Sequence, residues 1–374
     1  MRLITLILAV CLLNSCKKVY TNQDNSTLLK LKWNKSYEDD SIDKAVIGLQ
    51  WALSYVGANT PCNSNAIHIK NNTITLNTLN IGFSNKAKQN LKTLIAKTKT
   101  TEAYKKNESV DLGRFITLLL GSPEHYYSLV ETPKTLAKLK SNYTLNKNKG
   151  YINNSSIAFQ DRVISFSEQE QFNQLWISEE IDSITKTIYE FETIELLKNG
   201  QLRFGIYDEK GNRKNFANSR HTGAGKPSKC IWCHESNLNQ MFKKQSDVYG
   251  FLTAEQLQQK IITSRDNFHN NRLQQKNNLD YSKKQQHKLA ELLYISFLEP
   301  SLKRLSLEWH IEESQLKLLL KDLKTHKFND DFQFLGDLYY RQEVEVFSPF
   351  KAIPVSGSVR EQSAQEINHL NNDK

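Results

Sequence analysis

Hydrophobic residues recur at helical spacing through the first third of the chain. This pattern predicts helices over residues 41–57, 84–98 and 109–121. Ser84 is placed as the N-cap of the second helix. From Ile67 to Ile81 the apolar positions alternate around Asn71-Asn72, which predicts a small hairpin, with an irregular loop as the alternative.

The middle of the chain changes to strand periodicity. Strands rich in β-branched and aromatic residues are predicted over residues 157–166, 189–197, 202–207 and 213–216. Asn199-Gly200 separates the second strand from the third and is a strong hairpin signal. Phe172, Leu175 and Trp176 suggest a short helix between the first two strands. The region therefore reads as a small antiparallel meander.

The last third returns to helical periodicity. Thr253 and Gln256 form a capping-box pattern that opens one helix, and further helices are predicted over residues 283–298 and 306–324. Few apolar residues follow position 352, so the end of the chain is predicted to be a disordered tail. The predicted fold class is α+β: mostly helical, with a central β-meander and a helical C-terminal part.

Composition changes this picture little. Hydrophobic residues make up 39% of the chain and charged residues 24%, as in an ordinary globular protein, and the formal net charge is +10. That charge favours contact with anionic surfaces or acidic partners. The lysines are scattered among Asn and Gln, so they are interpreted as a solvated face and not as a nucleic-acid patch.

The first sixteen residues have the organisation of an export signal. Met1-Arg2 is a positive start, an apolar stretch runs from Leu3 to Leu13, and Ser15 precedes Cys16. Leu13-Asn14-Ser15-Cys16 resembles the lipobox of bacterial lipoproteins, which implies diacylation of Cys16. The apolar stretch is shorter than the roughly 20 apolar residues of a transmembrane helix. The alternative is an ordinary signal peptide cut near Ser15. Lys17 after the cysteine favours the outer membrane, facing the periplasm.

One motif carries specific chemistry: Cys230-Ile231-Trp232-Cys233-His234 reads Cys-x-x-Cys-His. It resembles the haem-attachment motif of c-type cytochromes, and the resemblance covers only these five residues. It implies one covalent haem c, bound through thioethers to Cys230 and Cys233, with His234 as the proximal iron ligand. Covalent attachment of haem occurs outside the cytoplasm, in agreement with the export signal.

Together these segments give a provisional domain map. It comprises a signal peptide (1–15), a polar tether (16–35), a helical subdomain (36–150), an antiparallel β part (151–217), a haem-binding helical part (218–350) and a disordered tail (351–374). Export and lipidation leave Cys62 as a third thiol. It is either a buried small hydrophobe or a disulfide partner.

The glycine-bearing loop before the motif offers candidate cofactor contacts. Arg220 and Lys226 lie within chain reach of haem propionates, and a guanidinium suits a carboxylate. His221 is also in this loop and is one candidate for the distal iron ligand. His310 is another, because it lies on the predicted apolar face of the 306–324 helix. His269 and His287 are less specific candidates, and an open distal position is a further possibility.

Met241 is not favoured as that distal ligand. On one continuous helix it would lie about 10 Å beyond His234 along the axis, on the proximal side of the ring. A break of the helix at Asn237 would remove this objection.

Three functions remain open at this point. The first is a lipid-anchored mono-haem cytochrome that exchanges electrons with a redox partner protein in the envelope. The second is a haem enzyme, or a sensor of gas or peroxide, with an open distal site. The third has no haem, and Cys230 and Cys233 form a redox disulfide or bind zinc with His234. An electron carrier is favoured over a catalyst.

Overall fold

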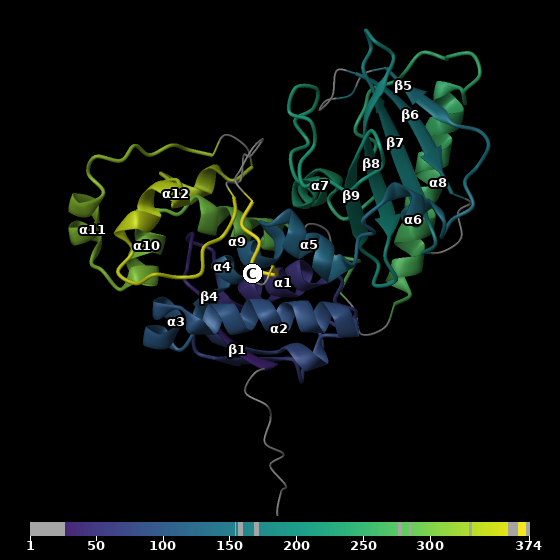
Figure 1. The fold of residues 1–374 in the computed structure, drawn as a ribbon. Coiled ribbons are helices and arrows are strands. Elements are labelled where there is room, and N and C mark those ends of the chain that lie inside the picture. The colour runs from purple at the N-terminus through teal and green to yellow at the C-terminus, as the bar shows by residue number, and fades with distance from the viewer. Residues whose placement is uncertain are drawn as a thin grey trace, which may run out of the picture.

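The computed structural model describes residues 27–153, 155, 160–167, 172–275, 279–283, 286–328, 331–357 and 366–371. The predicted signal peptide and the predicted lipidation site, Cys16, lie outside these residues. The described chain is a mixed α and β structure with a four-stranded and a five-stranded sheet in different parts of the molecule (Figure 1). Helix α7, Pro227–His234, contacts strand β9 of the larger sheet and helix α5 of the first part.

The smaller sheet has the strand order β2-β3-β1-β4. Its strands are β1 (Leu28–Lys32), β2 (Ile67–Lys70), β3 (Thr73–Asn77) and β4 (Val110–Asp111). β2 and β3 form the predicted hairpin, in which Asn71 adopts a positive φ of 53°. The prediction of a tether through residue 35 is wrong for β1, because Leu29 and Leu31 are fully buried and the strand pairs with both β3 and β4.

Helices cover this sheet and form the main core. They are α1 (Ile42–Tyr55), α2 (Asn85–Thr100), α3 (Glu102–Asn107), α4 (Leu112–Leu120) and α5 (Pro123–Val130). The Ser84 hydroxyl caps α2 as predicted, and Ser122 caps α5 with Pro123 in its first turn. Residues 36–150 are therefore a helical layer on a sheet, and not a purely helical subdomain.

The larger sheet is antiparallel throughout, with the order β5-β6-β7-β8-β9. Its strands are β5 (Gly150–Ile152), β6 (Asp161–Phe166), β7 (Leu175–Ile181), β8 (Ile188–Leu196) and β9 (Leu202–Asp208). The hairpin between β8 and β9 is confirmed, and Gly200 adopts a φ of 79° in its loop. The short helix predicted around Trp176 is wrong: Leu175 and Trp176 begin the central strand β7.

One face of the larger sheet packs against helix α6, Leu136–Lys140, and its neighbourhood. The other face is directed toward α7 and α8, Ala254–Leu273, whose predicted capping box at Thr253 is confirmed. The stretch between α7 and α8 has no regular secondary structure, contrary to the expectation that the chain is helical after the motif.

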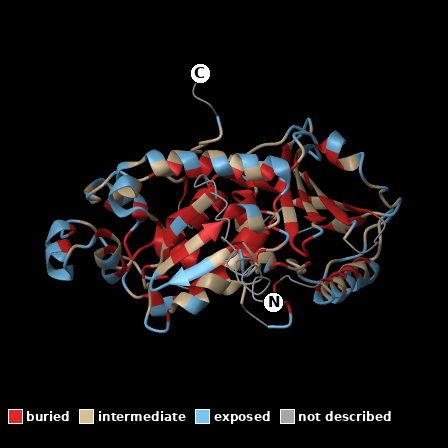
Figure 2. Cartoon of the chain, turned by 90° about the horizontal axis from the view of Figure 1, so that it is seen from below, coloured by how far each residue is buried: buried red, intermediate tan, exposed pale blue. Residues whose placement is uncertain are grey.

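The remaining helices return to the first part of the molecule. They are α9 (Lys288–Leu298), α10 (Leu302–Trp309), α11 (Glu313–Leu319) and α12 (Arg341–Val344). Short 3₁₀ turns lie at Gln333–Leu335 and Glu345–Phe347, and another follows β3 at Thr78–Asn80. The helix predicted over 306–324 is in fact two, because His310 ends α10 in the left-handed region (φ 57°). Figure 2 shows buried residues concentrated in the interior and exposed ones along the outer helical surfaces.

The prediction of a disordered tail is wrong for residues 351–357 and 366–371. Ile353 is buried, and its carbonyl accepts a hydrogen bond from the Arg114 guanidinium at 3.0 Å. The backbone N–H of His369 donates to Nε2 of the buried His125 at 2.8 Å. Few apolar residues suffice here, because backbone and polar groups of the first part of the chain bind this segment.

Candidate functional site

Helix α7 presents the three reactive side chains of the motif on one side. Pro227 occupies its first turn, where a missing N–H is not costly. Cys230 precedes Cys233 by three residues and His234 by four, so the three side chains share a helix face. The helix ends directly after His234, because Glu235 and Ser236 both have positive φ values, 48° and 63°.

The turn after the helix is fixed by polar contacts. The carbonyl of His234 accepts hydrogen bonds from the Asn237 backbone N–H at 2.8 Å and from Asn239 Nδ2 at 2.9 Å. The Ser236 carbonyl accepts from the Arg272 guanidinium of α8. These contacts reverse the chain, so that residues 238–242 return over the same side of α7.

Cys230 and His234 line a cavity of about 150 Å³ between α7 and the larger sheet. Strand alternation directs side chains of β6, β7, β8 and β9 into it at every second position. The apolar side chains of its wall include Ile164, Trp176, Ile194, Phe204, Leu238, Met241, Phe242 and Ile261. The His234 ring lies 5.6 Å from the Phe204 ring, centroid to centroid. The site is thus largely apolar around one imidazole and one thiol.

Burial holds the motif side chains in their neutral forms. It lowers the pKa of His234 to about 4 and raises the pKa of both thiols, that of Cys230 well above its usual range. The Glu192 carboxylate raises the pKa of Cys230 further. Nδ1 of His234 is buried without a hydrogen-bond partner among the described residues. Both thiols are free, so no disulfide closes the motif.

A cluster of charged residues on the sheet borders the apolar wall. Arg162 of β6 and Glu192 of β8 line the cavity. Glu180 of β7 is paired with Arg162, and Glu190 lies on β8 with Glu192. Arg162 Nε donates to Glu180 at 2.8 Å, and Lys214 donates to Glu190 at 2.7 Å. Arg162 Nη2 and Glu192 Oε1 are buried without partners among the described residues. The cavity therefore offers a hydrogen-bond donor and an acceptor at one side.

Burial and mutual repulsion shift the carboxyl groups of this cluster. The pKa of Glu180 rises to about 8 and that of Glu190 to about 7, mainly through burial and secondly through the charge of Glu192. Protons are therefore retained here at pH values where exposed carboxyl groups have lost them.

The position of Met241 corrects the expectation from a continuous helix. Because the chain reverses after His234, Met241 lines the same cavity as His234. It also lines a second, open hollow of about 960 Å³, bordered by Tyr151 and residues 240–246. Met241 and Phe242 are thus a thin wall between the two spaces.

The other predicted ligands lie elsewhere. His221 stacks on Tyr189, with ring centroids 4.4 Å apart, and does not line the cavity. His310 is exposed at the end of α10 and lines a different cavity, so its predicted inward position on a helix is wrong. Arg220 is exposed in its loop. The buried Lys226 donates to the Gly121 carbonyl at 3.1 Å, away from the cavity.

Sequence reasoning missed Arg162, Glu192 and the proximity of Met241. A weak signal existed for the first two, since each stands two positions from an isoleucine on the same strand face, Ile164 and Ile194. A charged residue within an apolar strand face is a candidate for a site. The position of Met241 had no such signal, because it depends on two left-handed residues.

The residues between the two cysteines have a structural role. Ile231 is buried in the core, and Trp232 packs edge-to-face on Tyr55 of α1 at 5.8 Å and against Tyr294 of α9 at 5.7 Å. Cys62 is half-buried, and burial raises its pKa to about 11, which fits a packed thiol.

Comparisons with protein-family models, curated proteins and solved structures find no match to this chain. Among the described residues no group of three or more His, Cys, Asp or Glu side chains could hold a metal ion. Within the same residues, no helix has the length and apolar character needed to cross a bilayer.

Proposed function

We propose that this chain is a mono-haem c-type cytochrome, lipid-anchored in the bacterial envelope, that transfers electrons to or from a partner protein. One observation carries the proposal: Cys230 and His234 line a single apolar cavity, with the free thiol of Cys233 on the same helix turn. These are the groups that bind haem covalently and as an axial ligand. The haem would supply one-electron redox chemistry.

The residues around the motif fit such a group chemically. Apolar and aromatic side chains form the walls, and the neutral imidazole of His234 is the form that binds iron. Arg162 replaces Arg220 as the candidate partner of a propionate, because its Nη2 is buried at the cavity without a partner among the described residues. Arg220 is exposed and does not line the cavity.

The cavity would have to enlarge in order to hold a haem. About 150 Å³ is below the roughly 300–1,000 Å³ typical of small-molecule sites. The adjoining hollow of about 960 Å³ shares Met241 and Phe242 as a wall. Outward movement of residues 240–246 would join the two spaces. These residues have no regular secondary structure, and the contact of Asn239 with the His234 carbonyl lies outside the part that moves.

Met241 is the side chain that would hold the haem iron together with His234. It enters the same cavity as His234, whereas His221 and His310 do not. A thioether ligand raises the reduction potential relative to a second imidazole. With His234 and Met241 both holding the iron, the haem would supply electron transfer. An open position, as in a haem enzyme or sensor, is the outcome to be tested against it.

The test is expression of the full chain in cells that carry the haem-maturation machinery. We expect the purified protein to retain haem after denaturation and to show the reduced spectrum of thioether-linked haem. The Cys230→Ala/Cys233→Ala double variant should lose haem on denaturation. Cys62→Ala is the matched control, because it removes a thiol outside the motif and should therefore retain haem.

Two other outcomes are informative. Folded wild-type protein without haem contradicts the proposal and leaves the dithiol chemistry of Cys230 and Cys233. Bound haem that is high-spin and shifts its spectrum with carbon monoxide supports an enzyme or sensor instead. Labelling with a fatty acid, lost on Cys16→Ser, tests the anchor separately.

A further inference from the structure

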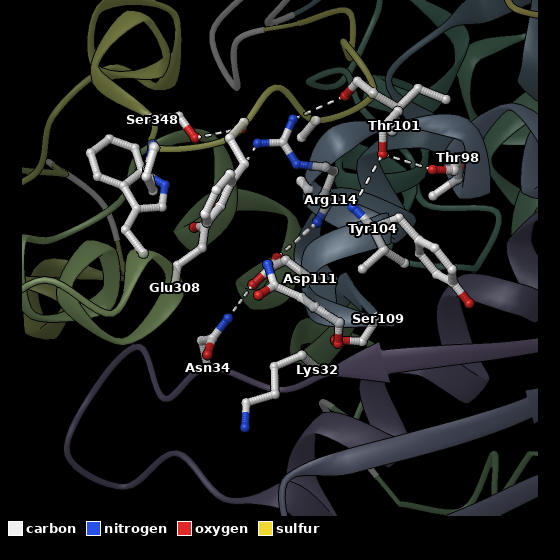
Figure 3. A pocket seen from close by; sticks show the side chains of 18 of the residues that line it. Lys32, Asn34, Thr98, Thr101, Tyr104, Ser109, Asp111, Arg114, Glu308 and Ser348 are labelled. Atoms are coloured by element: carbon white, nitrogen blue, oxygen red, sulfur yellow. Dashed lines mark hydrogen bonds and ion pairs between the residues drawn. The ribbon is translucent and has the colours of Figure 1, made fainter.

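The buried charges of the described chain include two clusters that differ in their balance. The first surrounds Arg114 and Glu308 beside a cavity of about 220 Å³ in the first part of the molecule (Figure 3). Its ion pairs join three cations to three anions: Arg114, Arg304 and Arg341 to Asp111, Glu308 and Glu345. Positive and negative charges are equal in number, so this cluster is neutral without a bound proton.

The second cluster lies on the face of the larger sheet that is directed toward α7, and it has more carboxyl groups than cations. Its acidic members are Glu180, Glu190 and Glu192, and its basic members are Arg162 and Lys214. Glu180 and Glu190 are directly paired across β7 and β8, and both are completely buried. Buried carboxylates in that arrangement repel each other, so the cluster is stabilised by a proton on one of them.

The neighbouring groups on β8 and β9 supply no compensating positive charge. Tyr189 stays neutral, because burial raises the pKa of its hydroxyl group far above the usual value. Asp208, which is paired with Glu190 across β9, is itself acidic and accepts hydrogen bonds from the backbone of the following turn. His221 stacks on the Tyr189 ring, and its charge acts on Asp182. The excess of carboxyl groups therefore persists within the sheet.

The elements that cover this face leave the excess in place. On α7, burial holds Cys230 and His234 in their neutral forms. On α8, the ammonium group of Lys260 lies 5.1 Å from the centre of the Phe166 ring. Lys243-Lys244, in the segment after α7, is exposed to solvent, which screens its charges. A proton is thus the charge that balances the cluster.

Arg162 connects this cluster to the cavity of the motif. Its Nε donates to Glu180 at 2.8 Å, whereas its Nη2 is buried at the cavity, where it is the candidate partner of a haem propionate. Glu192 lines the same cavity, and its charge acts on Cys230. Glu180 and Glu190 do not line it. A change of charge in the cavity would act on this pair through a buried and weakly screened medium.

We infer that electron transfer at this site is coupled to a proton: the Glu180–Glu190 pair takes up one proton when one electron enters the haem and releases it when the electron leaves. The inference rests on the proposed function, because it requires haem in the cavity. The electron comes from the redox partner protein and the proton from water. Reduction removes one positive charge from the cofactor, which favours the protonated form of a neighbouring carboxyl group.

The test is a redox titration of the haem-loaded full chain between about pH 6 and about pH 9, a range that includes the pKa values near 7 and 8 of Glu190 and Glu180. We expect the reduction potential to fall as the pH rises, because the reduced state binds the proton more tightly. A proton affinity about tenfold higher in the reduced state gives a total fall of about 59 mV. Reduced-minus-oxidised infrared spectra should show the gain of a protonated carboxyl group.

Glu180→Gln leaves two carboxyl groups for the two cations of the cluster. We therefore expect its reduction potential to be independent of pH in this range and its infrared difference to disappear. Glu179→Gln is the matched control, because the neighbouring side chain points to the opposite face of the sheet, where it pairs with Lys149. This control should keep the pH dependence of the wild type. Glu190→Gln, with the same expected loss, replaces the Glu180 variant if that protein does not fold.

The outcomes separate this inference from the proposed function. Haem-loaded wild-type protein with a potential independent of pH would overturn the inference alone, and so would a pH dependence that both glutamine variants of the pair retain. The bound haem would still support the proposed function in either case. Folded wild-type protein that contains no haem would overturn both.

Discussion

At the scale of single residues, the surroundings of α7 decide the chemistry of the motif. His234 and the two cysteines are neutral because they are buried, and a neutral imidazole is the form available to a metal. Glu192 and Arg162 reach the same cavity from the sheet. The reactive groups thus come from the helix, and the charges that adjust them come from the strands.

Substitution of Met241 tests the proposal that this residue is a ligand of a bound haem. We expect Met241→Leu, which keeps an apolar side chain of similar size, to yield high-spin haem with a lower reduction potential, because the thioether is lost. Phe242→Leu, in the same wall, should keep the low-spin spectrum. Absorption spectra report the spin state of the haem, and redox titration reports its reduction potential. An unchanged low-spin spectrum for the Met241 variant would assign the second ligand to another side chain.

The buried Glu190 predicts a pH dependence of stability. Its pKa is raised to about 7 in the folded protein, so between its unfolded value of 4.5 and pH 7 the native state holds more protons. The free energy of unfolding should therefore fall as the pH rises from about 5 to about 8. In the Glu190→Gln variant, the decrease of the free energy of unfolding over this pH range should be roughly 1–3 kcal/mol smaller than in the wild type.

Urea denaturation at the two ends of this pH range measures the effect. Glu180, with a pKa raised to about 8, adds a decrease of the same sign that the Glu190 variant retains. Glu209→Gln is the control, because this side chain is exposed at the turn after β9. Equal pH dependence in the Glu190 variant and the wild type would contradict the assignment.

At the scale of elements, close helix packing positions α9 beneath the motif helix. A Cβ at Gly48 of α1 would lie 2.6 Å from a methyl group of Leu293, and one at Gly113 of α4 would lie 2.5 Å from Cβ of Phe297. The absence of side chains at these two positions lets α1 and α4 approach α9. Tyr294 of the same helix then contacts Trp232 of α7.

Alanine at these glycines should separate the helices. We expect Gly48→Ala to destabilise the protein by about 1–3 kcal/mol, because backbone atoms of Leu289 also lie within 3 Å of the added Cβ. Chemical denaturation measures the loss. Lys92→Ala, on the exposed side of α2, should change stability by about 0.5 kcal/mol or less. A neutral Gly48 variant would show that the helices can shift at little cost.

At the scale of the whole molecule, residues near the C-terminus complete the first part of the fold. Arg114 of α4 donates to the Ile353 carbonyl and to Glu345, which follow it by more than 200 residues. The guanidinium groups of Arg114, Arg304 and Arg341 lie 4.1 to 5.3 Å from the centre of the Phe297 ring. These contacts connect α4, α9, α10 and α12 in one polar cluster.

Removal of one member should leave buried groups unpaired. We expect Arg114→Met to cost about 3–5 kcal/mol of stability, because the buried Ile353 carbonyl loses its donor and Glu345 keeps only its longer contact with Arg341, at 3.6 Å. Arg265→Met breaks an exposed pair with Asp266 and should cost about 1 kcal/mol at most. Thermal and urea denaturation compare the two variants. Equal effects would show that the cluster is not a principal source of stability.

Local sequence determined several of the individual elements. Apolar periodicity predicted α1, α2, α4 and α9, and the residues that cap α2 and α8 were recognised because capping depends on near neighbours. Asn199-Gly200 predicted the β8–β9 hairpin for the same reason. Cys230, Cys233 and His234 share a face of α7 because of their spacing alone, once this segment is helical.

Tertiary structure decided which distant groups meet at each cavity. Met241 reaches the cavity only because Glu235 and Ser236 adopt left-handed conformations, which no residue type there demands. Arg162 and Glu192 enter it through sheet register, and Lys32 and Trp309 line one cavity although they are far apart in the sequence. Local sequence limits the conformation of short segments, whereas these pairings depend on burial summed over the whole fold.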